Sequence, residues 1–175
     1  MKMDLKETIR SISDWPIKGV IFRDLTTLMQ DPIAFKESCD ILYNRYKDMG
    51  IDKIVGIDAR GFVFGAVLAY KMGIGFVPVR KKGKLPCKTI QETYDLEYGS
   101  DTLEIHEDAI KKGEKVIVVD DLIATGGTVG ATVKLVETLG AQLIECAFIV
   151  ELPDLMGRSK IPGVKVFAIT QFEGE

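Results

Sequence analysis

The sequence predicts an α/β fold built on a mainly parallel sheet with helices on both faces. Three observations lead to this prediction. Apolar runs of strand length alternate along the chain with segments of helical periodicity. Most of the strand candidates are continuous apolar runs, which is typical of strands buried on both faces of a parallel sheet. Charged or glycine-containing loops follow several of these strands, at the edge where such sheets bind ligands.

The composition is that of one soluble globular domain. The chain has 175 residues, 46% hydrophobic and 28% charged, and this length suffices for a substantial core. Its net charge of −3 argues against a nucleic-acid-binding surface over the whole domain. No apolar run reaches bilayer length, and the polar N-terminus has no signal-peptide pattern. Cys39, Cys87 and Cys146 lack zinc spacing and are odd in number, which favours a reducing cytoplasm. From the charge and the absence of a bilayer-length run, we expect no nucleic-acid or membrane partner.

The N-terminal segment is predicted to form a short helix and a short strand. Residues 4–12 carry apolar side chains at three- and four-residue spacing, which favours an amphipathic helix that ends before Pro16. Residues 19–25 are apolar up to an abrupt Arg-Asp pair. Two interpretations of this segment stay open: a strand packed on the core, which the spacing favours, and an edge where backbone groups and Phe22 face a flat ligand.

Residues 32–49 are predicted to form a long helix. Asp31 suits the N-cap, Pro32 the first helical position and Gly50 the C-terminal stop. We expect Cys39 to be buried on or near its apolar face. The apolar face is expected to contain Ile33, Phe35, Ile41, Leu42, Tyr43 and Tyr46.

A strand, a charged loop and a second helix come next. The apolar run over residues 53–57 predicts a buried strand, and residues 62–72 predict a helix that Gly73 closes. Arg60 lies between the two elements. Capping or solvation would explain this arginine, but a guanidinium at the junction of a strand and a helix also suits bidentate binding of a phosphate.

A basic segment and a hairpin follow the third strand, residues 76–79. Residues 80–84 read Arg-Lys-Lys-Gly-Lys, and residues 89–105 alternate around a turn predicted at 99–101. A solvated charge cluster is the usual interpretation of such a basic run. A basic, glycine-containing segment that leads into a long hairpin also suits a mobile lid. We interpret His106, the single histidine, as structural or exposed.

The stretch over residues 115–128 carries the clearest functional signal. An apolar run meets Asp120 and Asp121, then a small Thr/Gly loop, then a predicted helix over residues 129–139. Backbone N–H groups at a helix N-terminus bind anions, and glycines let an anion approach closely. The GxxxxGK[ST] and GxGxxG patterns are both absent. Two acids beside a monophosphate suit sugar hydroxyls or a nearby cation, so we predict a sugar-phosphate site. Acids that merely cap the next helix would explain one Asp well and two poorly.

Three shorter elements complete the prediction. Residues 107–112 are expected to form a brief helix that ends at Gly113. Residues 143–150 and 164–169 are expected to form the last two strands.

The stretch from Val116 to Thr128 resembles the phosphoribosyl-pyrophosphate-binding signature of the type I phosphoribosyltransferase family. It has the same apolar run, two acids, two apolar residues and small Thr/Gly loop. The resemblance extends along nearly the whole chain to the adenine phosphoribosyltransferases of that family. The other matching landmarks, in chain order, are Gly19–Asp24, Asp58–Phe62, Arg80–Pro86, Tyr94–Gly99 and Glu151–Leu155.

This resemblance implies a Rossmann-like type I phosphoribosyltransferase fold in a single domain of residues 1–175. A small hood would come from the N-terminal segment, and a mobile hairpin lid would span about 81–105. The implied reaction converts adenine and 5-phospho-α-D-ribose 1-diphosphate to AMP and pyrophosphate in purine salvage. Mg²⁺ would be held mainly by the sugar diphosphate, and the protein would be a homodimer.

The resemblance also implies a role for each group of site residues. Glu97 on the lid would be the catalytic residue that handles a proton of the purine ring. The 5′-phosphate and ribose would be bound by Asp120, Asp121, Ala124, Thr125, Gly126, Gly127 and Thr128. Pyrophosphate would be bound by Asp58, Ala59, Arg60, Arg80, Lys81 and Lys84. Adenine would be bound by Ile21, Phe22, Arg23 and Leu155. The family pattern further implies a cis peptide at Asp58–Ala59.

Two other functions fit parts of the sequence. A non-catalytic phosphoribosyl-binding regulator would keep the fold, but the acidic charge and the absence of a helix-turn-helix pattern argue against it. A phosphoribosyltransferase for hypoxanthine, guanine or xanthine would share the phosphate loop and differ only in the residues that bind the base.

Overall fold

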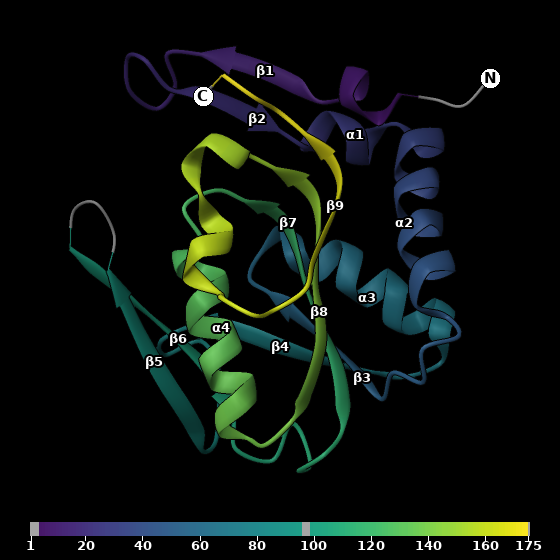
Figure 1. The fold of residues 1–175 in the computed structure, drawn as a ribbon, viewed down its shortest axis with the longest axis vertical. Coiled ribbons are helices and arrows are strands. Elements are labelled where there is room, and N and C mark those ends of the chain that lie inside the picture. Colours follow the sequence, from purple (N-terminus) through teal and green to yellow (C-terminus); the bar gives the residue numbers. More distant parts are fainter. Residues whose placement is uncertain (1–3, 96–98, 175) are drawn as a thin grey trace.

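The computed structural model describes residues 4–95 and 99–174 and is built around a mixed sheet of seven strands (Figure 1). The strands are β3 (Lys53–Ile57), β4 (Gly75–Lys81), β5 (Thr89–Asp95), β6 (Ser100–His106), β7 (Lys115–Ile123), β8 (Gln142–Glu151) and β9 (Val166–Gln171). Their order across the sheet is β5-β6-β4-β3-β7-β8-β9. Neighbours from β4 to β9 run parallel, whereas β6 pairs antiparallel with β4 and β5. The predicted α/β fold with a mainly parallel sheet is confirmed.

Helices cover both faces of this sheet. On one face lie α2 (Pro32–Tyr46) and α3 (Arg60–Met72), and on the other lies α4 (Gly127–Thr138) (Figure 1). Strand β7 shows why both faces are buried. Its Ile117 and Val119 pack into the core beneath α2 and α3, while Val116 and Val118 pack into the core beneath α4. Because alternate residues of a strand point to opposite faces, a strand between two helical layers must be apolar at every position.

The N-terminal segment forms a small hood of two strands rather than the predicted helix over residues 4–12. A 3₁₀ turn, η1 (Leu5–Thr8), leads into β1 (Arg10–Ser13), which pairs antiparallel with β2 (Ile21–Asp24), and a helix α1 (Thr26–Gln30) follows. A helix of nine residues has few internal hydrogen bonds to offset its nucleation cost, whereas β1 gains a complete partner strand. Helix α1 was not predicted from the sequence.

Helix α2 begins as predicted but ends earlier, and its predicted apolar face is confirmed except at Ile33. The Asp31 carboxylate accepts hydrogen bonds from the N–H groups of Ile33 and Ala34, which confirms the N-cap. The helix ends at Tyr46 rather than at Met49. Ile33 is 65% exposed. The buried side chains are Ala34, Ser38, Cys39, Leu42 and Tyr46, which follow the four-residue spacing of one helix face.

Three further expectations are tested in the second half of the chain. Residues 107–112 form turns and no helix, and the Glu114 carboxylate accepts the N–H of Lys111 at 2.7 Å to close the last turn. The hairpin is confirmed, but Ser100 pairs with Asp95 and Asp101 with Tyr94, so residues 100 and 101 belong to β6 rather than to the predicted turn at 99–101. The His106 imidazole contacts the carbonyl of Pro86 at 2.7 Å, which confirms a structural role. Within the described ranges, no helix has the length and apolar character needed to cross a membrane.

Candidate active site

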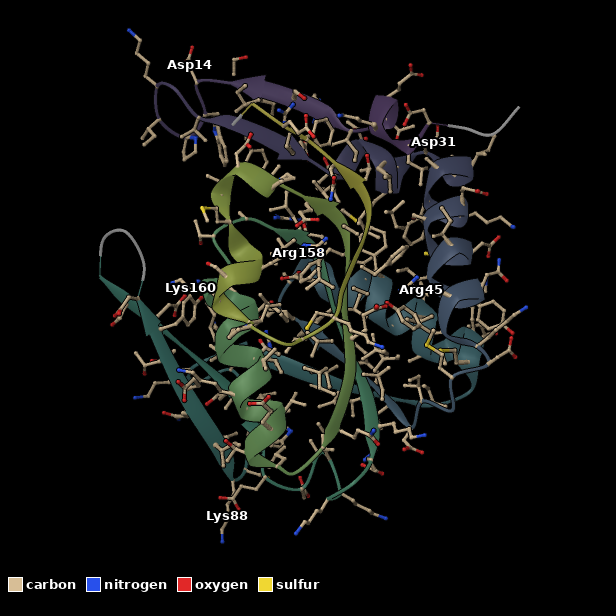
Figure 2. All side chains as sticks on the ribbon, viewed as in Figure 1. Asp14, Asp31, Arg45, Lys88, Arg158 and Lys160 are labelled. Carbon is tan, nitrogen blue, oxygen red and sulfur yellow. The ribbon has the colours of Figure 1, made fainter. Side chains whose placement is uncertain are left out.

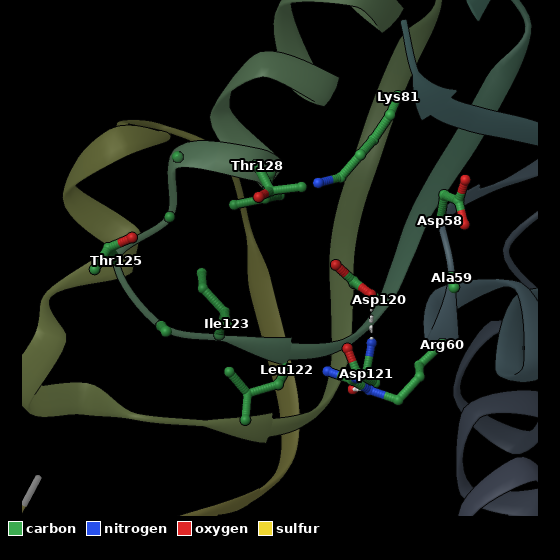
Figure 3. A pocket seen from close by; sticks show the side chains of 14 residues that line it. Asp58, Ala59, Arg60, Lys81, Asp120, Asp121, Leu122, Ile123, Thr125 and Thr128 are labelled. Carbon is green, nitrogen blue, oxygen red and sulfur yellow. Dashed lines mark hydrogen bonds and ion pairs between the residues drawn. The ribbon is translucent and has the colours of Figure 1, made fainter. Parts of the chain in front are cut away.

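A cavity of about 460 Å³ opens at the carboxyl ends of β3, β4 and β7 (Figure 3). Fourteen residues line it: Asp58, Ala59, Arg60, Lys81 and the continuous stretch of residues 120–129. The structure therefore brings together the whole predicted group for the 5′-phosphate and ribose. It adds four of the six predicted pyrophosphate residues to the same cavity. Leu122, Ile123 and Val129 also line it and were not predicted.

The phosphate loop, residues 124–127, connects β7 to α4. Gly126 has φ +82°, a conformation that favours glycine, and it directly precedes the first helical residue. The N–H groups of the first turn of α4 face this end of the helix, where the helix dipole also favours an anion. The Thr128 hydroxyl donates a hydrogen bond of 3.3 Å to the hydroxyl of Tyr94 on the hairpin. The loop is thus an anion site with a hairpin strand packed beside it.

The two adjacent acids of β7 have different partners. Asp120 and Asp121 point to opposite sides of the strand (Figure 3), as neighbouring strand residues do. Asp121 is 5% exposed, and its carboxylate forms an ion pair with the guanidinium of Arg60. Burial raises the pKa of Asp120 well above its ordinary value, and the neighbouring Asp121 charge raises it further. Burial alone would lower the pKa of Arg60, but the charge of Asp121 outweighs that effect and the net direction is upward.

The pyrophosphate loop lies at the end of β3, beside the acids. The Asp58–Ala59 peptide is cis, as predicted. Arg80 donates a hydrogen bond of 3.0 Å from Nε to the Asp58 carboxylate, so it supports the loop from outside the cavity. Gly61 begins the first turn of α3 against β7, where an added Cβ would lie 2.8 Å from both the Asp120 carboxylate and the carbonyl of Val119. Only glycine allows this approach.

The basic segment, residues 80–84, is held in place by specific contacts with β6, which its composition alone does not suggest. Lys81 belongs to β4, lines the cavity and pairs with Asp101 at 2.9 Å, and this hydrogen bond raises its pKa. The carboxylate of Glu104, a residue only 2% exposed, accepts hydrogen bonds from the N–H groups of Lys84 (3.0 Å) and Leu85 (2.8 Å). The Lys84 and Arg80 side chains do not line the cavity. Glu104 was not predicted, because its place between the two apolar strand residues 103 and 105 does not reveal the N–H groups that it binds.

None of the four predicted adenine residues lines the cavity. The Phe22 ring packs edge-on against Trp15, with ring centroids 4.4 Å apart. The Arg23 guanidinium lies 4.2 Å from the centre of the Phe172 ring. Leu155 is 39% exposed in a 3₁₀ turn, η2 (Pro153–Leu155). Strand β2 is confirmed, with half-buried side chains, and within the described ranges it pairs only with β1.

The predicted catalytic residue, Glu97, lies outside the described residues. It belongs to the connection between β5 and β6, the two strands of the hairpin. The structure places strand β5 of that hairpin against α4 through Tyr94 and through an ion pair of 2.8 Å between Glu92 and Lys134.

Comparison with known proteins gives consistent matches over the whole chain. Residues 24–174 match the family model described as a phosphoribosyl transferase domain. The chain is 66% identical over 173 residues to the adenine phosphoribosyltransferase of Desulfosudis oleivorans, covering 99% of this chain and 100% of that one. The crystal structure of adenine phosphoribosyltransferase from Thermoanaerobacter pseudethanolicus is similar with a TM-score of 0.92 and 48% identity, covering 96% of this chain and 98% of that one. The enzyme from Saccharomyces cerevisiae, crystallised with adenine and an imino-altritol bisphosphate, gives a TM-score of 0.89 and 44% identity, covering 95% and 96% of the two chains.

Proposed function

The chain belongs to the phosphoribosyl transferase family, and we propose that it converts adenine and 5-phospho-α-D-ribose 1-diphosphate to AMP and pyrophosphate, a step of purine salvage. One observation carries this proposal. A helix N-terminus suited to a phosphate, two acids suited to sugar hydroxyls and a separate cationic loop suited to a diphosphate share one cavity, in a chain 66% identical to an adenine phosphoribosyltransferase.

The sugar diphosphate is proposed to lie along the cavity from α4 to β3. Its 5′-phosphate occupies the phosphate loop, where each charge-assisted hydrogen bond contributes about 1.5–3 kcal/mol. Its ribose hydroxyls face Asp120 and Asp121 at the middle of the cavity. Its diphosphate lies between Arg60, on the Asp58–Arg60 loop, and Lys81, the two cations that line the opposite end.

The chemistry explains this division of the cavity. The bond between the anomeric carbon and the diphosphate oxygen breaks, and a purine ring nitrogen forms the new bond to that carbon. The sugar becomes oxocarbenium-like on the way, and negative charge grows on the departing diphosphate. Arg60 and Lys81 stabilise that charge where it develops. The ring nitrogen must lose its proton, and Glu97 is proposed to accept it.

Magnesium is proposed to accompany the sugar diphosphate rather than to occupy a site made by the protein alone. Within the described ranges, no group of three or more Asp, Glu, His or Cys side chains is placed to hold a metal ion. Mg²⁺ needs only one or two protein carboxylates when substrate phosphates supply the other ligands, and the cavity lining offers Asp58 and Asp120. The ion would neutralise charge on the leaving diphosphate.

Three finer proposals complete this function. Adenine is expected between Phe22 and Leu155, with backbone groups of Ile21 and Arg23 at its edge. The protein is expected to act as a homodimer, in which part of the basic group of Arg80, Lys81 and Lys84 reaches across the interface to pyrophosphate. We place it in the cytoplasm, and the state of its cysteines supports a reducing compartment, since all three are unpaired and only Cys87 is exposed.

The proposal is tested by incubating the protein with Mg²⁺, the sugar diphosphate and one nucleobase at a time, and identifying the nucleotide by mass. AMP from adenine, with little product from hypoxanthine, guanine or xanthine, is the expected result. An Arg60→Met variant is the matched negative control, because it removes one cation that lines the cavity. IMP or GMP as the main product would reassign the base, and no nucleotide from any base would refute the activity.

A further inference from the structure

The phosphate loop rests directly on the backbone of a segment that was not assigned to it. Gly157 lies in a 3₁₀ turn, η3 (Gly157–Lys160), and a Cβ added there would lie 2.3 Å from the carbonyl oxygen of Ala124. In the reverse direction, a Cβ added to Gly126 would lie 2.2 Å from the carbonyl oxygen of Gly157. These contacts join main chain to main chain. The position of the Gly157 backbone therefore sets the position of the phosphate loop.

An ion pair between the half-exposed Arg158 and the buried Glu151 holds this supporting segment. Arg158 donates two hydrogen bonds of 2.6 Å, from Nε and Nη2, to the two carboxylate oxygens of Glu151 at the end of β8. Gln171 on β9 donates a third, of 2.7 Å, to the same carboxylate. The Glu151 side chain is only 6% exposed. A bidentate pair of this kind fixes orientation as well as distance.

The same segment also reaches the hood. Leu155, the predicted adenine residue, precedes Gly157 by two positions. The chain just after β9 binds back to the segment: Gly174 donates its N–H to the Asp154 carboxylate at 2.6 Å, and Phe172 donates its N–H to the carbonyl of Glu151 at 3.0 Å. The Phe172 ring in turn lies under the guanidinium of Arg23 on β2. One short segment thus touches both the phosphate loop and the part of the protein expected to hold the base.

We infer that Arg158 and Glu151 are positioning residues that fix the phosphate loop and the base-binding segment relative to each other. Neither residue lines the cavity. Arg158 acts through Gly157 on the phosphate loop and through Leu155 on the base. This inference rests on the proposed function, because only a ligand with a phosphate at one end and a base at the other needs both contacts at a set separation. Catalysis depends on such separations, since a misplacement of about 1 Å can slow a reaction about a hundredfold.

The chain provides a matched control on the same strand. Arg45 of α2 donates hydrogen bonds of 2.6 and 2.8 Å to both carboxylate oxygens of Glu145 on β8. The Glu145 side chain is also 6% exposed. Figure 2 shows Arg45 at α2 and Arg158 beside the segment that precedes β9, and neither Arg45 nor Glu145 lines the cavity. The two pairs are alike in geometry and in the burial of the carboxylate, although the Arg45 side chain is less exposed (35%) than that of Arg158 (51%), and only the Arg158 pair supports the phosphate loop.

The experiment compares Arg158→Met with Arg45→Met in the full-length protein. For each variant we would measure KM for adenine and for the sugar diphosphate, the affinities of AMP and of ribose 5-phosphate by calorimetry, and Tm. Both variants are expected to lower Tm. Arg158→Met alone is expected to raise both KM values and weaken AMP binding about tenfold, which corresponds to roughly 1.4 kcal/mol. Ribose 5-phosphate, which lacks the base, is expected to lose less affinity than AMP.

A conservative variant keeps the inference testable if Arg158→Met does not fold. Arg158→Lys retains the charge and a single hydrogen bond, so its AMP affinity is expected to fall between those of the wild type and Arg158→Met. Equal changes in KM for the Arg158 and Arg45 variants, or a change in Tm alone at Arg158, would overturn the inference. A wild-type protein that makes no nucleotide would instead refute the proposed function, which the calorimetric measurements do not require.

Discussion

At the scale of single residues, the cavity is lined both by side chains that stabilise the folded protein and by side chains that destabilise it. Asp121 is buried but paired with Arg60, so its charge has a partner. Asp120 has no cation of its own among the contacts described above, and both burial and its neighbour raise its pKa. Side chains arranged for a ligand often destabilise the protein without that ligand. Asp120 is the clearest such residue here.

Replacement of Asp120 by Asn is expected to stabilise the free protein and impair the reaction. The folded-state pKa of Asp120 is raised above its ordinary value of 3.8, so above that pH the buried negative charge disfavours the folded state. Asp120→Asn should therefore have a higher Tm than the wild type at pH 7, and the difference should vanish as the pH falls below about 4. Loss of a charged hydrogen-bond partner for the ribose should reduce kcat/KM about 10- to 100-fold.

Thermal unfolding followed by circular dichroism, at pH values from 3 to 7, measures this effect. The exposed Asp48 serves as a control, since Asp48→Asn removes a charge of the same kind outside the cavity. A lower Tm for Asp120→Asn than for the wild type at pH 7 would contradict the prediction.

Most of the cavity residues could be predicted from the sequence because their chemistry is local. Asp120, Asp121 and the loop to Thr128 are adjacent in the chain, so their spacing alone predicts an anion site beside two acids. Gly61, Gly157 and Glu104 could not be found this way. Each of them is required by a partner that only folding brings near, such as the carbonyl of Ala124 for Gly157. A residue whose role depends on a distant backbone atom carries no local signature.

At the scale of elements, the N-terminal hood shows how pairing can override periodicity. The apolar spacing of residues 4–12 was interpreted as a helix, and Leu5 and Ile9 are indeed buried. The segment instead places Arg10 opposite Asp24, where Arg10 Nη2 lies 2.5 Å from the Asp24 carboxylate. Three apolar positions cannot distinguish a short helix from a turn followed by a strand. The partner strand β2 determines that residues 10–13 form a strand, and it begins only at Ile21.

Protonation of Asp24 is expected to weaken the hood in acid. A hydrogen bond from the Thr26 hydroxyl, with a second contribution from Arg10, lowers the pKa of Asp24 from 3.8 to about 2. A lowered folded-state pKa stabilises the protein above pH 3.8, and that contribution disappears as the pH falls through about 2. Asp24→Asn should lower Tm at pH 7, with a gap to the wild type that closes between about pH 4 and pH 2. A gap that stays constant over this range would show that Asp24 contributes through packing and not through its charge.

The basic segment is expected to depend on Glu104 for its position. Its carboxylate accepts the N–H groups of Lys84 and Leu85, and these backbone hydrogen bonds outweigh burial and lower its pKa. Both N–H groups bind the same oxygen, Oε1, so Glu104→Gln keeps them only as weaker neutral hydrogen bonds, and its NH2 group takes the place of the Oε2 that accepts from Thr89 and Gln91. In the reverse reaction, from AMP and pyrophosphate, the KM for pyrophosphate should rise about tenfold, for a loss of roughly 1.4 kcal/mol. Glu107→Gln, on an exposed residue beyond β6, is the control, and an equal effect in both variants would contradict the role of Glu104.

At the scale of the whole molecule, the cavity is a product of sheet order. Residues of the pyrophosphate loop and of the phosphate loop are about sixty positions apart in the chain, yet β3 and β7 are neighbours in the sheet. Parallel neighbours end at the same edge, so their following loops meet. The alternation of strands and helices predicted this arrangement. It could not predict that β6 and β5 would extend the sheet in the antiparallel sense, because that depends on the pairing of Arg80 with Glu104 and of Lys81 with Leu103.

Binding of AMP is expected to stabilise the whole chain, because the cavity joins the centre of the sheet to the segment before β9. At a concentration about 100 times its Kd, AMP should stabilise the folded protein by about 2.7 kcal/mol. For a chain of this size that corresponds to a rise in Tm of about 5–10 °C. Adenosine, which lacks the phosphate, should give a smaller rise in the same thermal scan. Equal shifts from both ligands would mean that the phosphate loop contributes nothing to nucleotide binding.

Of the three cysteines, only Cys87 is exposed, so the unaltered protein can be labelled with a dye at this residue. Burial raises the pKa of the Cys39 thiol to about 11 and that of Cys146 to about 12, so neither forms much thiolate at neutral pH. Cys87 is exposed and follows the basic segment by three residues, just before β5. A thiol-reactive dye should therefore attach at this one position without any substitution. Its fluorescence would report the approach of pyrophosphate to Lys81 and its neighbours in the unaltered protein.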